Sequence, residues 1–317
     1  MDSLELTVIT IVAMSAPLIF AVIGETITER VGVVNLSMEG TLLITALTGF
    51  AITIWTDSLY LGILSSALIG GFIAFIIVWI NFRFYINQIA VGFIFTIFLW
   101  KLSSYLGGDF VRIPGPYLNK ITIPMLSEIP FLGPIFFDNN ILVLSSIILI
   151  PLSWFFLFRT NLGVNLRAVG ENPIAADARG LSVMKYRFIY SVIGGILIGI
   201  GGATFSLEVK YGWSEGHTLN YGWIALAIVI FGGWNPVRAS VGVYGFGILQ
   251  VLSLKLQSVT IGLSQILPLI PFPLMILTLV LIQSANKNEG RWFPKPIRLL
   301  IFGNQPQSLG ITYKKDS

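Results

Sequence analysis

The stretch LYLGILSSALIGGFIAFIIVWIN, residues 59–81, contains no charged residue. As an α-helix it would be about 35 Å long, enough to cross the roughly 30 Å of hydrocarbon in a bilayer. The rest of the chain is similar: 55% of its 317 residues are hydrophobic and only 11% are charged, against about 25% in a soluble domain. This small number of charged residues cannot cover a water-exposed surface. The composition therefore excludes a soluble enzyme, a nucleic-acid-binding protein and a disordered chain.

Nine such apolar stretches predict an all-α, polytopic transmembrane bundle of about nine spans, within a range of eight to ten. They are residues 6–23, 40–56, 59–81, 86–106, 141–158, 188–207, 221–235, 240–256 and 266–285. We expect a single domain over residues 1–317, with a cytoplasmic connection at 159–187 and a cytoplasmic tail at 286–317. Acidic rather than basic residues precede the first stretch, which argues against a cleaved signal peptide and favours an outer N-terminus.

The Lys and Arg residues test this topology, because they set the orientation of membrane proteins. Nine spans from an outer N-terminus place most of them inside: Arg30, Arg83, Arg159, Arg167, Arg179, Lys185, Arg187, Arg238, Lys287, Arg291, Lys295, Arg298, Lys314 and Lys315. The outer loops would hold only Arg112, Lys120 and Lys210. The asymmetry predicts a multi-pass cell-membrane protein with its N-terminus outside and its C-terminus inside. The tail charges then serve orientation, and we expect lipid rather than nucleic acid as a partner.

Motifs for chemistry are missing from the sequence. Nothing matches a P-loop, so the chain cannot hydrolyse ATP by that route. With no cysteine and a single histidine, we expect no metal centre and no cofactor. His217, in a predicted outer loop, is expected at the surface. The run GGILIGIGG, residues 194–202, predicts close contact between helices through small residues. We therefore expect a protein that is not an enzyme.

The inner connection 159–187 contains signals for a short helix. Asn172 is a favoured N-cap, Pro173 suits the first helical position, and Gly180 suits a left-handed ending. The residues between them include three small side chains, Ala175, Ala176 and Ala178. Another protein's groove could therefore approach this helix closely. The alternative is an ordinary amphipathic connector.

Two further groups are candidates for the wall of a transport pathway. Glu39 begins an apolar run, and Asn35 lies four residues earlier, on the same face if both are helical. Gly232 and Gly233 permit close approach or a broken helix, which Asn235 and the following proline would end. A buried carboxylate is costly in lipid, so Glu39 should face a cavity or a partner. The alternative is that Glu39 only marks the interfacial start of a span.

Four stretches in order carry a resemblance to a known family. They are ERVGVVNLSMEG (29–40), NQIAVGFIFTIF (87–98), AVGENPIAADARG (168–180) and WIALAIVIFGGWNP (223–236). Together they cover most of the chain from about residue 15 to 285. The chain resembles the permeases of ATP-binding cassette (ABC) importers in the ribose and branched-chain amino-acid group, nearest to the branch for nucleosides or simple sugars.

The resemblance implies a division of labour. Separate ATPase subunits would drive transport, an extracytoplasmic binding protein would deliver substrate, and a second permease would complete a heterodimer. The short helix would be the coupling helix that docks into the ATPase, formed by Asn172, Pro173, Ala175, Ala176 and Gly180 and flanked by Arg167 and Glu171. Alternatives are a branched-chain amino-acid or other small-solute permease, an ion-coupled secondary transporter and a membrane-embedded enzyme.

Overall fold

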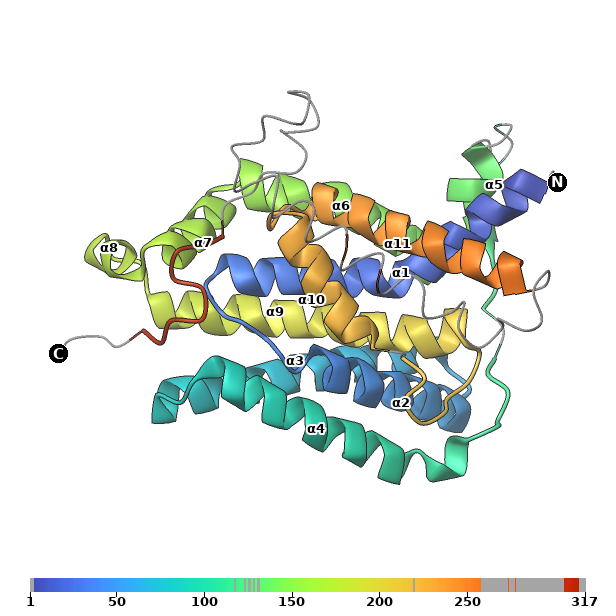
Figure 1. The fold of residues 1–317 in the computed structure, drawn as a ribbon, viewed down its shortest axis with the longest axis horizontal. Helices are drawn as coiled ribbons and strands as arrows, with labels where there is room; N and C mark the ends of the chain where they lie inside the picture. The colour runs from blue at the N-terminus through green and yellow to red at the C-terminus, as the bar shows by residue number, and fades with distance from the viewer. Residues whose placement is uncertain are drawn as a thin grey trace.

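The computed structural model describes residues 3–116, 118–122, 124, 127, 129, 132–218, 220–257, 273, 277 and 305–313. These residues form a helix bundle, elongated along the direction of its longest helices (Figure 1). The N-terminus and the short helix α5 (Leu132–Phe136) lie at one end, and helices α7 (Asn161–Glu171) and α8 (Pro173–Ala178) lie at the other. The described part of the tail, residues 305–313, also lies beside α7.

Seven helices in the described part of the chain are long and apolar enough to cross a membrane. They are α1 (Ser3–Arg30), α2 (Met38–Thr56), α3 (Leu59–Phe84), α4 (Gln88–Leu106), α6 (Ile141–Arg159), α9 (Val183–Thr204), which the π-helix η2 (Phe205–Val209) continues, and α11 (Pro236–Gln257). Each matches one of the predicted apolar stretches. The smaller elements between α4 and α6 include η1 (Gly108–Phe110) and an antiparallel pair of two-residue strands, β1 (Ile121–Thr122) and β2 (Asp138–Asn139).

The predicted span over 221–235 is not a single full-length helix. That stretch forms α10 (Tyr221–Phe231), a helix of only 11 residues, which is about 16 Å long and reaches half of a bilayer core. Its apolar run is continuous in sequence, but the chain enters the helix from inside the bundle. The predicted span 266–285 lies outside the described residues, apart from two isolated positions.

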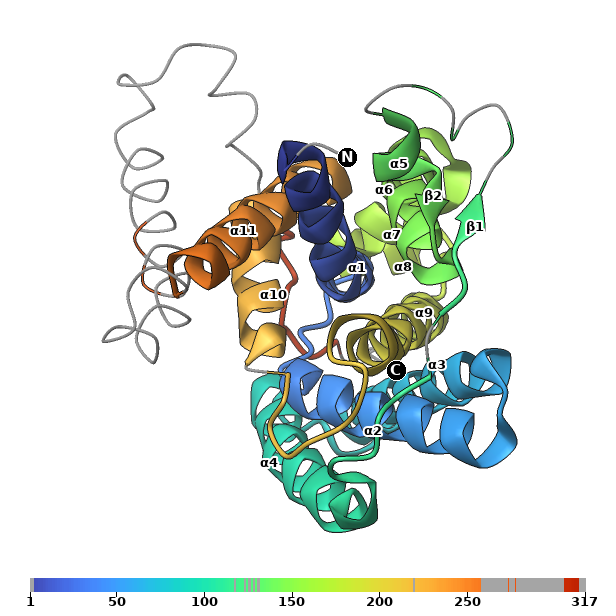
Figure 2. The same cartoon turned by 90° about the vertical axis from the view of Figure 1, so that its right-hand side faces the viewer.

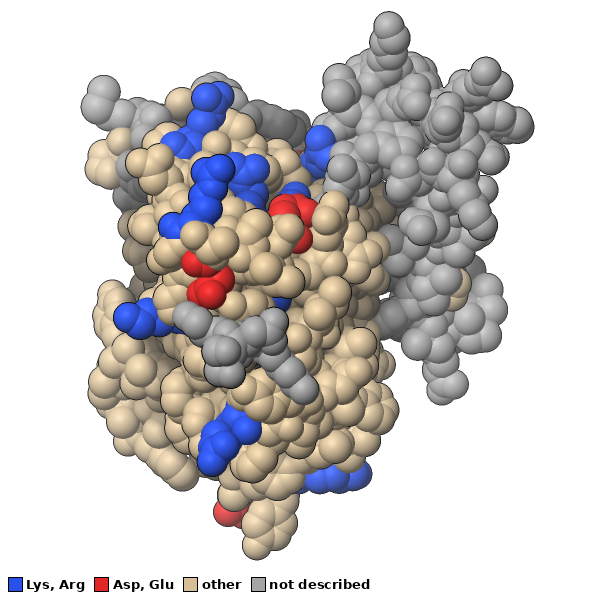
Figure 3. Space-filling model, turned by 90° about the vertical axis from the view of Figure 1, so that its left-hand side faces the viewer, with Lys and Arg blue, Asp and Glu red and all other residues tan. Residues whose placement is uncertain are grey.

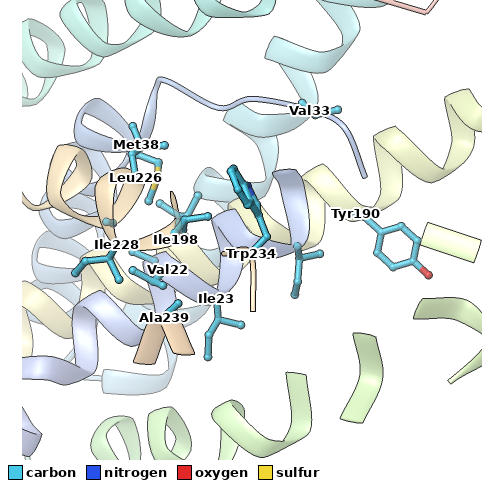
Figure 4. Close-up of a cluster of buried hydrophobic side chains, with 14 of the residues drawn as sticks. Val22, Ile23, Val33, Met38, Tyr190, Ile198, Leu226, Ile228, Trp234 and Ala239 are labelled. Carbon is cyan, nitrogen blue, oxygen red and sulfur yellow. The ribbon is translucent and has the colours of Figure 1, made fainter. Parts of the chain in front are cut away.

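Helix α9 lies at the centre and contacts α1, α2 and α3 (Figure 2). Its glycines permit this, as the run 194–202 predicts. A Cβ at Gly194 would come within 2.7 Å of the carbonyl oxygen of Gly24 in α1, and one at Gly195 within 2.5 Å of that of Gly70 in α3. The main apolar core forms around this helix, where side chains of α1, α9, α10 and α11 converge (Figure 4).

Helix α2 begins inside the bundle, about halfway along α4. The Thr96 hydroxyl donates to the carbonyl of Leu36 at 2.6 Å, and a Cβ at Gly40 would lie 2.7 Å from the Thr96 carbonyl oxygen. Thr96 is roughly 12 Å from the start of α4 and 15 Å from its end. Helix α10 starts at the same level, since a Cβ at Gly222 would lie 2.3 Å from the backbone nitrogen of Glu39. The first turns of two helices therefore meet in the interior.

Candidate functional site

Helix α8 forms where the sequence predicts the short helix. The side chain of Asn172 caps it by accepting from the N–H of Ala175 at 3.0 Å, and Pro173 takes the first helical position. Gly180 follows with a φ of +84°, the left-handed conformation that a glycine adopts without strain. These three residues fix a small helix at one end of the bundle, in an area rich in basic side chains (Figure 3).

The two faces of α8 differ. Ile174, Ala175 and Ala178 are exposed, and Ile174 has 74% of its surface open. Ala176 is only 4% exposed and packs into the main core. The sequence places Ala175 and Ala176 together in one docking element, whereas the structure puts them on opposite faces. The surface available to another protein is therefore Ile174, Ala175 and Ala178.

Arg30, the last residue of α1, joins α7 to the turn after α10. Its Nε donates to the carbonyl of Trp234 at 2.8 Å, and its Nη2 to that of Gly233 at 3.2 Å. Its Nη1 lies 4.0 Å from a carboxylate oxygen of Glu171, at the end of α7. The neighbouring Glu29 accepts a hydrogen bond from the indole N–H of Trp234. We call these five residues the Arg30 cluster.

The turn between α10 and α11 is shaped by its own residues. Gly233 and Trp234 both have a positive φ, of 59° and 55°. A Cβ at Gly232 would lie 2.6 Å from the backbone of Ala239, so only glycine allows this approach. The side chain of Asn235 accepts from the N–H of Val237 at 3.0 Å and so caps α11. Gly232, Gly233 and Asn235 thus form a tight turn beside Arg30.

Arg167 of α7 belongs to the same region. Its guanidinium lies 5.0 Å from the centre of the Phe158 ring, and that of Arg30 lies 5.9 Å from the same ring. Its Nε is buried and makes no hydrogen bond to the described residues. Arg167 and Glu171, which the sequence assigns to the flanks of the short helix, therefore lie on the α7 side of the Arg30 cluster.

Glu39 binds the start of α10. Its side chain is 2% exposed; Oε1 accepts from the Thr218 hydroxyl at 2.6 Å, and Oε2 from the N–H of Gly222 at 2.7 Å. A carboxylate at a helix N-terminus satisfies free N–H groups and complements the helix dipole. We call Glu39, Thr218 and Gly222 the mid-bundle junction. The junction and the turn Gly232–Asn235 lie at opposite ends of α10.

Asn35 does not share a helical face with Glu39, and that expectation is wrong. Helix α2 begins only at Met38, and Asn35 lies in the connection before it. Its side-chain oxygen accepts from the N–H of Ser37 at 3.1 Å and from the Ser37 hydroxyl at 2.6 Å. Such local bonds favour a turn over a helix.

Sequence reasoning missed Glu25 and Glu29, because it ends the first span at residue 23. Helix α1 continues to Arg30, and both carboxylates are buried within it. Glu25 Oε1 accepts from the N–H of Asn35 at 3.1 Å, while Oε2 is buried without a partner among the described residues. Acidic residues at positions i and i+4 after an apolar run are the signal that would have extended the helix.

The end of the bundle near the N-terminus holds a cavity of about 570 Å³, within the range of small-molecule sites. Its lining is both apolar and polar and includes Met14, Asn140, Glu208 and Lys210. Burial lowers the pKa of Lys210.

His217 is 6% exposed, not at the surface as expected, and its ring stacks on Phe205, with 5.3 Å between the ring centres. Burial lowers its pKa to about 4, so the ring is neutral at pH 7.

Comparison with known proteins confirms the resemblance found in the sequence. Residues 7–279 match the family described as "Branched-chain amino acid transport system / permease component". A protein of Haloferax volcanii with the provisional name of a glucose ABC transporter permease, TsgC13, is 36% identical over 80% of this chain and 78% of its own length.

Two further relatives are similar over most of both chains. The nucleoside ABC transporter permease NupC of Lactococcus lactis is 31% identical over 88% of this chain and 93% of its own. The guanosine ABC transporter permease NupQ of Bacillus subtilis is 35% identical over 76% and 79%. No solved structure matches the chain significantly. The chain therefore belongs to the branched-chain amino acid transport system permease family, as a plasma-membrane subunit of an ABC importer in which partner ATPase subunits hydrolyse the ATP.

Proposed function

We propose that this permease forms the transmembrane pathway for a nucleoside or a simple sugar. The observation that carries the proposal is the identity of 31–36% with three permeases named for nucleosides, guanosine or glucose. The cavity near the N-terminal end of the bundle offers a space of suitable size whose wall is both polar and apolar. The second candidate is a branched-chain amino acid or other small solute, which the family description favours.

The proposed topology is a single domain over 1–317 with about nine spans, the N-terminus outside and the tail inside. The distribution of Lys and Arg supports this orientation. The N-terminal end of α1 and the tail segment 305–313 lie at opposite ends of the bundle (Figure 1), as an odd number of crossings requires. In this orientation α7, α8 and the Arg30 cluster face the cytoplasm.

We assign ATPase docking to the exposed face of α8. Asn172, Pro173 and Gly180 set the shape of the helix, Ala175 contacts the ATPase, and Ala176 anchors the helix to the core. Arg167 and Glu171 support α8 from α7. A helix whose exposed face has one large side chain, Ile174, and otherwise small ones allows a partner's groove to close around it.

The transport pathway is assigned to the side of the bundle containing α10. Glu39 holds the N-terminal end of this short helix, Asn35 shapes the turn that leads to Glu39, and the turn Gly232, Gly233 and Asn235 sets its cytoplasmic end. Short helices that begin in the bilayer interior are typical of transporter binding sites. Glu39 acts on the pathway by positioning α10.

A heterodimer with a second permease, served by an extracytoplasmic binding protein, completes the proposed importer. Each of the three organisms above has a second permease that matches this chain at lower identity, 23–28%. This chain thus resembles one member of each set more than the other. We expect the two permeases of such a pair to form different halves of the transport pathway.

The substrate is tested by reconstituting the purified importer in liposomes with its ATPase, second permease and binding protein. We expect ATP-dependent uptake of a labelled nucleoside or sugar, with leucine excluded. Uptake of leucine alone would replace the substrate assignment by the second candidate. Uptake that needs an ion gradient and no ATP would contradict the importer itself.

Docking is tested by the change Ala175→Arg, which puts a large charge on the exposed face of α8. We expect normal membrane levels but loss of ATPase copurification. Ala168→Arg, the same change at an exposed position of α7, is the matched control and should retain the ATPase. Ala176→Arg should instead reduce the amount of folded protein. Full ATPase copurification with Ala175→Arg would rule out this face.

A further inference from the structure

The tail segment 305–313 is bound along the cytoplasmic side of the bundle. The N–H and the hydroxyl of Ser308 both donate to the carbonyl of Gly170, at 3.0 and 2.6 Å. The N–H of Gly310 donates to the carbonyl of Gly32 at 3.3 Å, in the connection between α1 and α2. Backbone hydrogen bonds therefore hold the tail segment against parts of the chain more than a hundred positions earlier in the sequence.

A buried arginine anchors this segment. Arg187 of α9 is fully buried, and its side chain forms no ion pair with the described residues. Its Nη1 donates to the carbonyl of Ile311 at 2.8 Å, and its Nη2 to the Ser308 hydroxyl at 3.2 Å. A buried guanidinium is very costly without hydrogen-bond acceptors. The tail supplies acceptors, so its position is built into the fold.

The beginning of the segment reaches the Arg30 cluster. The N–H of Gln307 lies 3.4 Å from Oε2 of Glu171, whose other oxygen faces Arg30. Helix α7 is therefore held at its last turn from two sides, by Arg30 and by the tail. The last turn of α7 leads directly into α8, the helix assigned to ATPase docking.

We propose that residues 305–313 form a strap that fixes the end of α7, so that movement of α8 is passed to Arg30 and α10 instead of being lost in bending of α7. This inference rests on the proposed docking role of α8. Ser308 and Arg187 are positioning residues here, because they act through α7 and touch neither substrate nor nucleotide. Loosening the strap should leave the ATPase bound while less transport results from each ATP hydrolysed.

The change Ser308→Ala tests the strap in the complete importer. It removes the hydroxyl that links Gly170 to Arg187, and we expect the ratio of solute transported to ATP hydrolysed to fall about five- to tenfold, as for the loss of one or two hydrogen bonds. ATPase copurification should be unchanged. Gln305→Ala, at an exposed position of the same segment, is the matched control and should keep the wild-type ratio.

Two outcomes would overturn the strap. An unchanged ratio in Ser308→Ala would show that the segment is not used in coupling, and failure of this variant to accumulate would show a role in folding alone. Position is checked independently of transport. The chain has no cysteine, so the double variant Glu171→Cys with Gln307→Cys contains only the introduced pair. A short thiol cross-linker should join this pair in membranes, and absence of the link would contradict the contact. A wild-type importer inactive on every solute, with this link present, would refute the proposed function but not the placement of the tail.

Discussion

The two ends of α10 are held by opposite charges from one short stretch of sequence. Residues 29–40 supply Arg30, which binds the carbonyls of Gly233 and Trp234, and Glu39, which binds the N–H of Gly222. A cation at the C-terminal end and an anion at the N-terminal end both complement the helix dipole. The same stretch therefore fixes a helix nearly two hundred residues away at both of its ends.

The surroundings of these two charges differ. Glu39 is buried, and its described partners lie within the mid-bundle junction. Arg30 also reaches Glu171, whose side chain is 42% exposed, at the end of α7. One end of α10 is closed off from the surface, while the other is linked to the helix that leads to α8. We therefore expect the junction to hold one end of α10 in place (the fixed end) and the Arg30 cluster to pass movement of α8 to the other end (the signalling end).

The largest effect is expected from breaking the signalling end. Arg30→Met leaves Glu171 without its cation and the carbonyls of Gly233 and Trp234 without their donor, and each hydrogen bond from a charged group contributes about 1.5–3 kcal/mol. We expect ATP-dependent uptake to fall more than about a hundredfold, with the ATPase still bound. Arg159→Met, an exposed arginine at the same end, is the control. Near-normal uptake in Arg30→Met would remove the cluster from the mechanism.

A smaller effect is expected at the fixed end. Glu39→Gln keeps the size of the side chain but replaces charge-assisted hydrogen bonds by neutral ones, a loss of about 1 kcal/mol. Uptake should slow roughly fivefold, and Glu39→Ala should be worse because the N-terminus of α10 loses its acceptor. Glu215→Gln, at an exposed outer position, should behave as wild type. Equal rates for Glu39→Ala and wild type would refute the junction.

The last effect is on stability rather than on transport, and concerns His217, which precedes Thr218 at the junction. Its pKa of about 4 lies below the value of roughly 6.5 in an unfolded chain. The unfolded state therefore binds more protons between these values, and the stabilisation present above pH 6.5 is lost as the pH falls towards 4. At pH 5 we expect a loss of about 2 kcal/mol relative to pH 7.5. Thermal unfolding in detergent should show this loss of stability for the wild type and not for His217→Gln. If both proteins lost the same stability between pH 7.5 and pH 5, His217 would not be the group responsible.

Much of the fold follows from the sequence. Seven apolar stretches become helices, since length and hydrophobicity decide a span, although α1 continues to Arg30, well past its predicted end at residue 23. Asn172, Pro173 and Gly180 define α8 because capping is a local interaction. The run 221–235 forms a helix shorter than predicted, because an apolar run shows only that a segment is buried and not the depth at which its helix begins.

The site is less predictable, because its contacts join distant segments. Composition marks Glu39 as a residue that needs a partner, but nothing in the sequence pairs it with Gly222. Arg30 reads as an orientation signal, and its bond to Trp234 depends on the turn at Gly233. Ala175 and Ala176 look equivalent in sequence, and only packing against the core separates their faces.

Helix α10 is proposed to connect the Arg30 cluster to the mid-bundle junction. A double-mutant cycle in reconstituted importer tests this connection, with Arg30→Lys, Glu39→Gln and the double variant compared in transport per ATP. The two sites are separated by the length of α10, about 16 Å, and changes that far apart are normally additive. We predict non-additivity, with the double variant no worse than the poorer single variant. A loss equal to the product of the two single losses would show that the two ends of α10 act independently.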